Sequence, residues 1–156
     1  MTHPNPGFQV LLESATQQDI PVLLPLVRQF YHHFGYPYHE AQKTDALMHF
    51  IQDESRGRLL IVKNNENAIG YVLIAFCFSL EFDGVIAFVD ELFIEPSSRQ
   101  KRAGSQVLEQ VEKLCGSLGM KAVRLESEAD NSRATALYAR TGYHDHKRRL
   151  MTKRFN

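Results

Sequence analysis

The sequence predicts a single mixed α/β domain, in which a central, mostly antiparallel sheet of six to seven strands is flanked by about four helices. Its length of 156 residues is typical of one domain and allows a full hydrophobic core. Apolar residues recur at helical spacing in some segments and fill others almost without interruption. The segments follow the order strand, two helices, three strands, helix, strand, helix and closing strand, which indicates a mixed sheet.

The first third of the chain is predicted to form a short strand and two helices. Residues 8–13 are the strand. Apolar residues at helical spacing then predict a helix over residues 20–34, which the sequence Gly35-Tyr36-Pro37 ends. A second helix is predicted from about Glu40 to a point before Gly57.

Three strands are predicted to follow in close succession. They cover residues 58–63, 68–80 and 85–95. The segments between them, residues 64–67 and 82–84, contain the Asn, Asp and Gly residues that favour tight turns. The two longer strands hold few polar residues, which is typical of strands covered on both faces.

The last third is predicted to add two helices and at least two strands. Residues 105–118 have the apolar face of an amphipathic helix, and residues 121–126 alternate as a strand does. Asn131 is expected to cap a short helix that reaches Arg140. Residues 143–154 are predicted to form a closing strand or strand pair.

Composition and charge argue against several classes of function. Lysine and arginine together number 18, as do aspartate and glutamate, so the net charge is zero and nucleic-acid binding is not expected. No apolar run approaches the roughly 20 residues of a membrane span, so no membrane association is expected. The N-terminus lacks the features of a signal peptide, and residues 1–6 are predicted to be a flexible tail. Cys77 and Cys115 are predicted to be reduced and buried, as in a cytoplasmic protein.

Two adjacent acids interrupt the last of the three central strands. Asp90 and Glu91 lie within an otherwise apolar segment, and successive side chains on a strand point to opposite faces. A carboxylate inside a covered sheet is costly unless it is paired or solvated. Either acid could therefore form a salt bridge with a neighbouring cation, or one of them could face a substrate cleft. The residues alone leave both interpretations open.

A basic loop leads from this strand into the next helix. Residues 99–104, Arg-Gln-Lys-Arg-Ala-Gly, place three cations and several backbone amides at a helix N-terminus. Cations are unfavourable there on a bare helix, whereas a phosphate would be stabilised by the amides and the helix dipole. A solvated basic helix start is the alternative. The chain contains neither G-x-x-x-x-G-K-[ST] nor G-x-G-x-x-G, which argues against the common nucleotide-binding loops.

A third segment, residues 131–143, carries a candidate site on one helical face. Asn131, Ala134 and Tyr138 are spaced i, i+3 and i+7 and therefore share one side of the predicted helix. Small neighbouring residues leave room for a ligand to pack closely. Tyr138 would offer its hydroxyl to that ligand or, alternatively, pack as an ordinary half-buried tyrosine.

Together these segments resemble the GNAT superfamily of N-acetyltransferases. That family has a strand ending in an apolar triplet and a proline, here residues 92–96, and then R/Q-x-x-G-x-G/A, here residues 99–104. Its later motif N-x-x-A-x-x-x-Y-x-x-x-G-[FY] is matched by residues 131–143 at every fixed position, and the order of elements agrees over residues 8–154. Arg102 departs from the pattern, because the family usually has a glycine there. The Arg102 side chain is expected to swing outward and add charge, since a helical backbone would not require glycine.

The resemblance implies an N-acetyltransferase that moves an acetyl group from acetyl-CoA to a primary amine of a small molecule, amino acid or peptide by direct attack. It implies Glu91 as the base, with Asp90 as the alternative, and Tyr138 as the group that protonates the leaving thiolate. The residues expected to bind acetyl-CoA are Leu92, Phe93, Ile94, Arg99, Gln100, Lys101, Arg102, Ala103, Gly104, Ser105, Asn131, Ala134 and Tyr138. Those expected to bind the acceptor are Tyr31, Phe34, Tyr36, Glu81 and Asp90.

Partners follow the same resemblance. Acetyl-CoA is the co-substrate, no metal is expected, and a homodimer is compatible with the family. The identity of the acceptor amine does not follow from the sequence. The alternative function is a catalytically inactive module that binds acyl-CoA or another protein.

Overall fold

The computed structural model describes residues 7–155, apart from the side chains of Gln100 and Lys101, and the chain forms two compact units, Met1–Glu126 and Ser127–Asn156. The predicted flexible tail, residues 1–6, lies outside the described residues. The first unit holds the sheet, and the second holds one helix, α4 (Ser132–Arg140), with the C-terminal segment.

Within residues 7–126 the chain folds into a five-stranded sheet with helices before and after its central strands. The strands are β1 (Leu11–Ser14), β2 (Gly57–Asn64), β3 (Asn67–Ser79), β4 (Gly84–Ile94) and β5 (Val123–Leu125). The α-helices are α1 (Ile20–Phe34), α2 (Glu40–Ile51) and α3 (Ala103–Ser117), and short 3₁₀ turns are η1 (Gln17–Asp19), η2 (Leu80–Phe82) and η3 (Pro96–Lys101).

The strands are hydrogen-bonded to one another in sequence order. β1 to β4 form an antiparallel meander, and β5 returns parallel to β4 after the α3 crossover that a parallel pair requires. The predicted mixed, mostly antiparallel α/β fold is therefore confirmed, although the described residues contain five strands rather than six to seven.

The missing strands are those predicted at the C-terminus. No strand forms over residues 143–155, so the prediction of a closing strand or strand pair is wrong for the described structure. Residues 144–149, His-Asp-His-Lys-Arg-Arg, offer no apolar side chain that a sheet could bury. Lys147 also adopts a left-handed backbone with φ of 57°, which interrupts an extended run.

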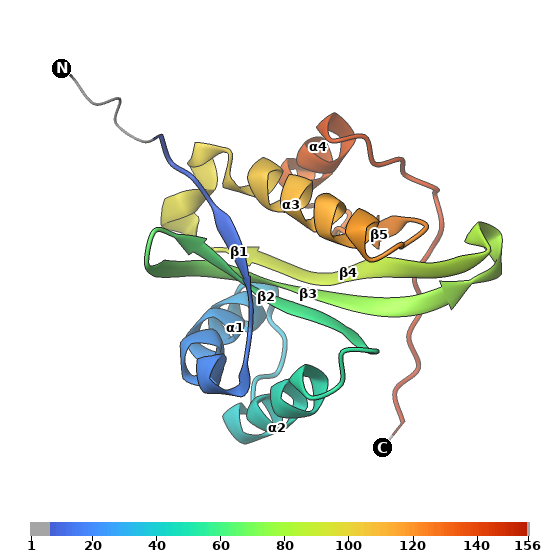
Figure 1. Ribbon diagram of the computed structural model, residues 1–156. Helices are drawn as coiled ribbons and strands as arrows, with labels where there is room; N and C mark the ends of the chain where they lie inside the picture. Colours follow the sequence, from blue (N-terminus) through green and yellow to red (C-terminus); the bar gives the residue numbers. More distant parts are fainter. Residues whose placement is uncertain (1–6, 156) are drawn as a thin grey trace. The chain divides into compact units, whose positions relative to one another are not determined.

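Both faces of the sheet are covered in the first unit. Along β2, Leu59 and Ile61 point into a core shared with α1 and α2, whereas Leu60 and Val62 point into a core shared with α3. Figure 1 shows this layering, with α1 and α2 on one side of the strands and α3 on the other. The sheet thus separates two hydrophobic cores, and a side chain's place along a strand decides which one it enters.

Two glutamines of α3 extend the sheet at β1. Gln106 accepts a hydrogen bond from the Val10 amide at 2.8 Å and donates to the Phe8 carbonyl at 3.1 Å. Gln110 accepts from the Leu12 amide at 3.1 Å and donates to the Val10 carbonyl at 2.7 Å. The strand predicted from residue 8 is therefore assigned only from Leu11, because the backbone before it pairs with glutamine side chains.

The hairpin of β3 and β4 runs beyond the rest of the sheet. β2 begins at Gly57, opposite Ala75 of β3, so the residues after Ala75 have only β4 as a strand neighbour. Phe78 and Leu80 are 67% and 81% exposed. Cys115 is buried as predicted, but Cys77 is exposed in this projecting hairpin, so its predicted burial is wrong. The continuous apolar sequence of β3 therefore does not mean that both faces of its last residues are covered.

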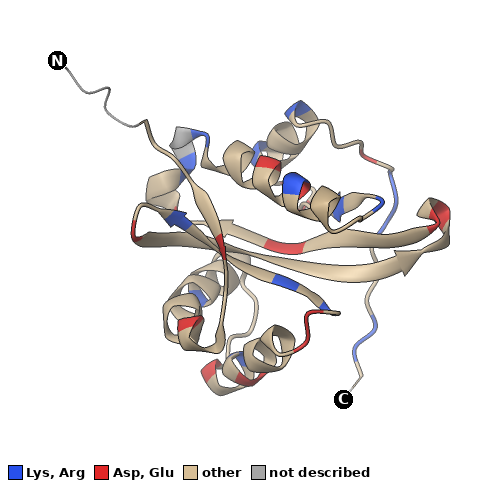
Figure 2. Cartoon of the chain, in the orientation of Figure 1, with Lys and Arg blue, Asp and Glu red and all other residues tan. Residues whose placement is uncertain are grey.

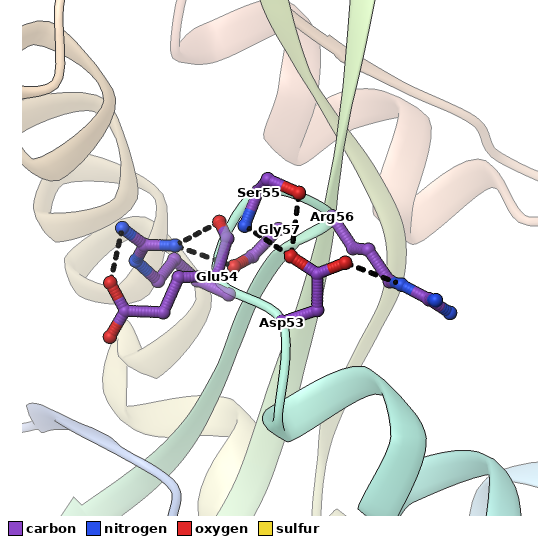
Figure 3. A network of polar contacts seen from close by, with 6 residues as sticks. Asp53, Glu54, Ser55, Arg56 and Gly57 are labelled. Atoms are coloured by element: carbon purple, nitrogen blue, oxygen red, sulfur yellow. Dashed lines mark hydrogen bonds and ion pairs between the residues drawn. The ribbon is translucent and has the colours of Figure 1, made fainter.

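A network of polar contacts shapes the turn between α2 and β2 (Figure 3). The Asp53 carboxylate accepts hydrogen bonds from the Ser55 amide and hydroxyl at 3.0 and 2.6 Å and from the Arg56 side chain at 3.0 Å. The Arg58 guanidinium donates to the Glu54 carbonyl at 2.6 Å. These contacts fix the turn that leads into Gly57, the first residue of β2. The backbone of Gly57 passes close to β3, because a Cβ atom there would lie 1.8 Å from the Ile74 carbonyl oxygen.

Charged residues are sparse along the central strands and frequent on helices and loops (Figure 2). An acidic position in the middle of β4 is the exception on that strand. Among residues 7–155, no helix combines the length and apolarity needed to cross a membrane.

The close approach of β3 and β4 gives the first prediction. A Cβ atom on Gly70 of β3 would lie 2.0 Å from the Phe93 carbonyl oxygen of β4. We expect Gly70→Ala to reduce the free energy of unfolding by about 2–3 kcal/mol, because the backbones would have to separate. Gly116→Ala is the matched control: a Cβ there meets nothing within 4 Å, and alanine should stabilise α3 by roughly 0.5–1 kcal/mol. Urea unfolding measures both, and equal effects would contradict the prediction.

Candidate active site

The site begins at a β-bulge in β4. Leu73 of β3 pairs with Glu91, whereas the next residue, Ile74, pairs with Val89. Asp90 is therefore an extra residue without a partner of its own on β3. Val89 packs in the core beneath α3, whereas Glu91, only two residues later, lies on the α1 side. In a regular strand Glu91 would face α3, as Val89 does, and the bulge turns it toward α1 instead.

Two tyrosines hold the Glu91 carboxylate. Tyr31 of α1 donates its hydroxyl to Oε1 at 2.7 Å, and Tyr71 of β3 donates to Oε2 at 2.8 Å. Tyr71 is fully buried. Neither Asp90 nor Glu91 has a cation within salt-bridge distance in the described part of the chain, so the salt-bridge interpretation left open by the sequence is not observed.

The surroundings of Glu91 raise the pKa of its carboxyl. Burial raises the pKa of Glu91, and the hydrogen bonds from Tyr31 and Tyr71 offset part of that rise. The charge of Asp90 raises the pKa further, and Lys43 lowers it. Burial, reinforced by Glu91, also raises the pKa of both tyrosine hydroxyls, so they remain protonated donors. A carboxylate with a raised pKa accepts a proton more readily near neutral pH.

An aromatic cluster adjoins the Tyr31 ring. Phe34 at the end of α1 stacks on Tyr36 with centroids 5.6 Å apart, and Tyr36 meets Tyr31 edge-on at 5.8 Å. The Tyr38 ring also meets Tyr31 edge-on, with centroids 6.3 Å apart. The structure therefore brings together three of the residues predicted to bind the acceptor, and it adds the Lys43 ammonium of α2, which lies 3.9 Å above the Tyr31 ring centroid.

The other two predicted acceptor residues are placed differently. Asp90 is exposed in the bulge. Glu81 lies in η2, where it forms an ion pair with Arg124 at 2.6 Å. Glu81 precedes β4, and the rise along that strand puts it roughly 20 Å from Glu91. Glu81 and Glu91 therefore do not share one site within the first unit.

Beyond the bulge, one edge of β4 is open in the described part of the first unit. β5 runs beside β4 only at residues 87–89, so residues 90–94 have no strand neighbour on that side. The Phe93 carbonyl faces β3. Because backbone groups alternate between the two edges, Leu92 and Ile94 present theirs to the open edge.

Arg99 joins the end of β4 to the following loop. Its Nε donates to the Ile94 carbonyl at 2.7 Å, and its guanidinium lies 5.6 Å from the Phe93 ring centroid. The guanidinium thus spans the strand end from which the basic loop begins.

The N-terminus of α3 follows directly on the basic loop. The first helical hydrogen bond runs from the Gln106 amide to the Arg102 carbonyl at 3.1 Å, which leaves the amides of Ala103, Gly104 and Ser105 without intrahelical acceptors. The Arg102 side chain makes no capping bond, and the first turn has no acid. This terminus is therefore suited to an anion. The predicted contributions of the Gln100 and Lys101 side chains lie outside the described residues.

Arg102 corrects an expectation from the sequence. Its side chain is exposed as expected, but its backbone is left-handed, with φ of 59° and ψ of 20°. The expectation of a helical backbone at this position is wrong, because the turn from η3 into α3 reverses the chain here. Glycine adopts this conformation without strain, which explains why the family pattern has glycine.

The third predicted segment lies in the second unit. The Asn131 side chain accepts a hydrogen bond from the Ala134 amide at 3.1 Å, so its predicted capping of α4 is confirmed. The Tyr138 ring meets Tyr143 edge-on at 6.1 Å, and burial raises the pKa of the Tyr138 hydroxyl. The ligand-binding roles of Asn131, Ala134 and Tyr138 stay predictions.

Sequence reasoning missed Tyr71 and Lys43. Tyr71 stands in a nearly apolar strand, where a tyrosine is indistinguishable from a core residue. Lys43 stands on an otherwise ordinary helix. Only the pairing of β3 with β4 and the packing of α2 beside α1 bring both residues to the Tyr31–Glu91 contact, so no local signal was available for either.

Comparison with known proteins decides the family. Residues 24–143 match the acetyltransferase (GNAT) family. The chain belongs to that family. GNAT proteins are acyltransferases that use acetyl-CoA as co-substrate and act on small-molecule or peptide acceptors.

Individual relatives agree with this GNAT assignment. The chain is 27% identical over 134 residues to the uncharacterised N-acetyltransferase YhfO of Bacillus subtilis (strain 168), covering 86% of this chain and 89% of that protein. An integron cassette protein from the mobile metagenome of Cole Harbour Salt Marsh superposes with a TM-score of 0.82 at 26% identity, over 93% of this chain and 90% of that one. The aminoglycoside 6'-N-acetyltransferase AAC(6')-Ih of Acinetobacter baumannii shares the fold, with a TM-score of 0.76 at 16% identity, over 95% and 99% of the two chains.

The left-handed backbone at Arg102 gives the second prediction. We expect Arg102→Gly to be more stable than Arg102→Ala by about 1 kcal/mol, because both remove the charge and only glycine relieves the backbone. At Glu109, inside α3, the order should reverse, with alanine more stable than glycine by about 1 kcal/mol. Denaturant unfolding of the four variants measures this. The same order at both positions would refute a strained backbone at Arg102.

Proposed function

We propose that this protein is an N-acetyltransferase that moves the acetyl group of acetyl-CoA to a primary amine, with Glu91 as the base. The observation that carries the proposal is the Glu91 carboxylate, half-buried and held by two tyrosine hydroxyls beside the open edge of β4. A structural acid would be expected to have a cationic partner, whereas a base needs a raised pKa and a fixed position.

The reaction is a direct transfer. An alkyl ammonium with a pKa near ~10 is only about one part in a thousand neutral at pH 7, so the acceptor has to lose a proton before it attacks. Glu91 takes that proton, directly or through a water molecule. The amine nitrogen then forms a bond to the thioester carbonyl carbon, and the carbon–sulfur bond breaks. Tyr138, which matches the family's tyrosine, supplies the proton for the leaving thiolate.

Acetyl-CoA binding is assigned to the open edge of β4 and the start of α3. The Leu92 backbone and the Ile94 amide would pair with the pantetheine arm, because the Ile94 carbonyl already accepts a hydrogen bond from Arg99. The first amides of α3, at residues 103–105, would bind the pyrophosphate, with Arg99 to Arg102 adding positive charge. Asn131, Ala134 and Tyr138 would flank the acetyl end of the co-substrate.

The acceptor site is assigned to the aromatic cluster of Tyr31, Phe34 and Tyr36. Aromatic faces beside a carboxylate favour a cationic amine. The fold neighbour from Acinetobacter baumannii is named as acting on aminoglycosides, which are amines, but its 16% identity carries the fold alone. A small molecule, an amino acid and a peptide all remain within the proposed class, and the cytoplasmic location and the homodimer stay predictions.

The proposal predicts both binding and turnover. Acetyl-CoA at 100 times its Kd should stabilise the protein by about 2.7 kcal/mol and raise its melting temperature. A panel of primary amines should then release free CoA thiol, measured with a thiol reagent, and each amine with acetyl-CoA but without the protein is the control for uncatalysed cleavage. A melting shift without transfer to any amine would favour the inactive binding module. If acetyl-CoA caused no melting shift and no amine released CoA, the proposal as a whole would be refuted.

Removing the base gives a pH-dependent prediction. In the unchanged protein, kcat/KM should fall as pH drops through the raised pKa of Glu91, because protonation removes the base. Glu91→Gln should lose this acidic limb and about 10²–10⁴-fold in activity. Asp90→Asn is the matched control and should keep the limb. If the limb persists in Glu91→Gln and disappears in Asp90→Asn, the base is Asp90.

A further inference from the structure

We infer that Lys43 is a self-acetylation site: when no other amine is present, the protein transfers an acetyl group to Nζ of its own Lys43. This inference rests on the proposed acetyl transfer and adds a modification site to it. It follows from the position of the ammonium, from its lack of an ion pair and from its chemical class.

The Lys43 ammonium lies against the same tyrosine that binds Glu91. Nζ is 3.9 Å from the centroid of the Tyr31 ring, and the hydroxyl of that ring donates to Glu91 Oε1 at 2.7 Å. One phenol therefore separates the amine from the carboxylate assigned as the base. The positive charge of Lys43 is also close enough to lower the pKa of Glu91.

Lys43 differs from the lysines that form ion pairs. Lys63 contacts Glu13 at 2.6 Å, and Lys113 contacts Glu109 at 2.7 Å. No carboxylate lies within salt-bridge distance of Lys43 among the described residues. The half-buried Lys43 side chain therefore has no ion pair to break before it moves away from the Tyr31 ring.

The chemical class of this side chain matches the proposed acceptor. A lysine ends in a primary amine on a flexible chain of four carbons, which can swing from the Tyr31 ring toward the edge of β4. Glu91 accepts one proton from the ammonium, through water. Nζ forms a bond to the acetyl carbonyl carbon, and the carbon–sulfur bond of acetyl-CoA breaks. The nitrogen loses its second proton as the thiolate takes one up and leaves as CoA, and Glu91 then releases the first proton to solvent. The products are acetyl-Lys43, free CoA and one released proton.

Acetylation would change the site itself. The amide is neutral, so it loses the cation–π contact with Tyr31 and no longer lowers the pKa of Glu91. It also leaves a bulkier group on the aromatic cluster where an acceptor would bind. Self-acetylation would therefore reduce transfer to external amines, and an added alkyl amine should compete with Lys43 for modification.

The test uses the full chain and ¹³C-labelled acetyl-CoA without an added amine, followed by peptide mass spectrometry. Lys43 should acquire label at least about tenfold faster than Lys63 or Lys113, at a rate unchanged when the protein is diluted, because the reaction is intramolecular. Glu91→Gln should slow labelling of Lys43 by at least about 10²-fold. Lys43→Arg should abolish it, whereas Lys113→Arg, on the exposed face of α3, should leave it unchanged.

Two results would overturn the inference. Label spread evenly over the lysines and insensitive to Glu91→Gln would mean ordinary chemical acetylation. An unlabelled Lys43 in a protein that acetylates an amine of the panel would refute self-acetylation and leave the proposed function standing. If no acetyl group reached either Lys43 or any amine, both self-acetylation and the proposed function would be refuted.

Discussion

The two hydrogen bonds from Tyr31 and Tyr71 to Glu91 are the constraint on which the site depends. An ionised carboxylate between a sheet and a helix is costly without partners, and here each oxygen accepts a hydroxyl. The donors come from α1 and β3, and the acceptor from β4. One polar contact therefore fixes the distance between helix and sheet at the place where the chemistry is assigned. The packing of α1 on the sheet and the proposed function therefore depend on the same three side chains.

The bulge at Asp90 makes this contact feasible. A regular strand would send Val89 and Glu91 into the same core, and the acid would lie beneath α3 among aliphatic side chains. One extra residue lets Val89 stay in that core while Glu91 and Phe93 face α1. The same irregularity falls where β5 stops pairing with β4. The Glu91 side chain is thus turned toward α1 at the point along β4 where the strand edge becomes open.

Much of the fold was predictable because burial leaves a periodic pattern. The helices at residues 20–34 and 40–51 and the three central strands follow from that pattern, and the motifs of residues 92–104 and 131–143 indicated the family. The bulge, the left-handed Arg102 and the role of Tyr71 left no local pattern, since each arises from pairing between distant segments. The apolar content around Cys77 wrongly predicted that this residue is buried, because the hairpin of β3 and β4 extends beyond the rest of the sheet. Within the strands expected at residues 143–154, residues 144–149 have no apolar side chain to bury.

The glutamines of α3 have a consequence for how the molecule behaves among its own copies. β1 is an outer strand of the sheet, and an outer strand with free amides and carbonyls is a template for addition of a strand from another chain. Gln106 and Gln110 already occupy backbone groups at residues 8, 10 and 12. A neighbouring molecule would have to displace four hydrogen bonds before it could lengthen the sheet here. Helix α3, whose N-terminus is suited to an anion, therefore also protects β1 from edge-to-edge aggregation through these two glutamines.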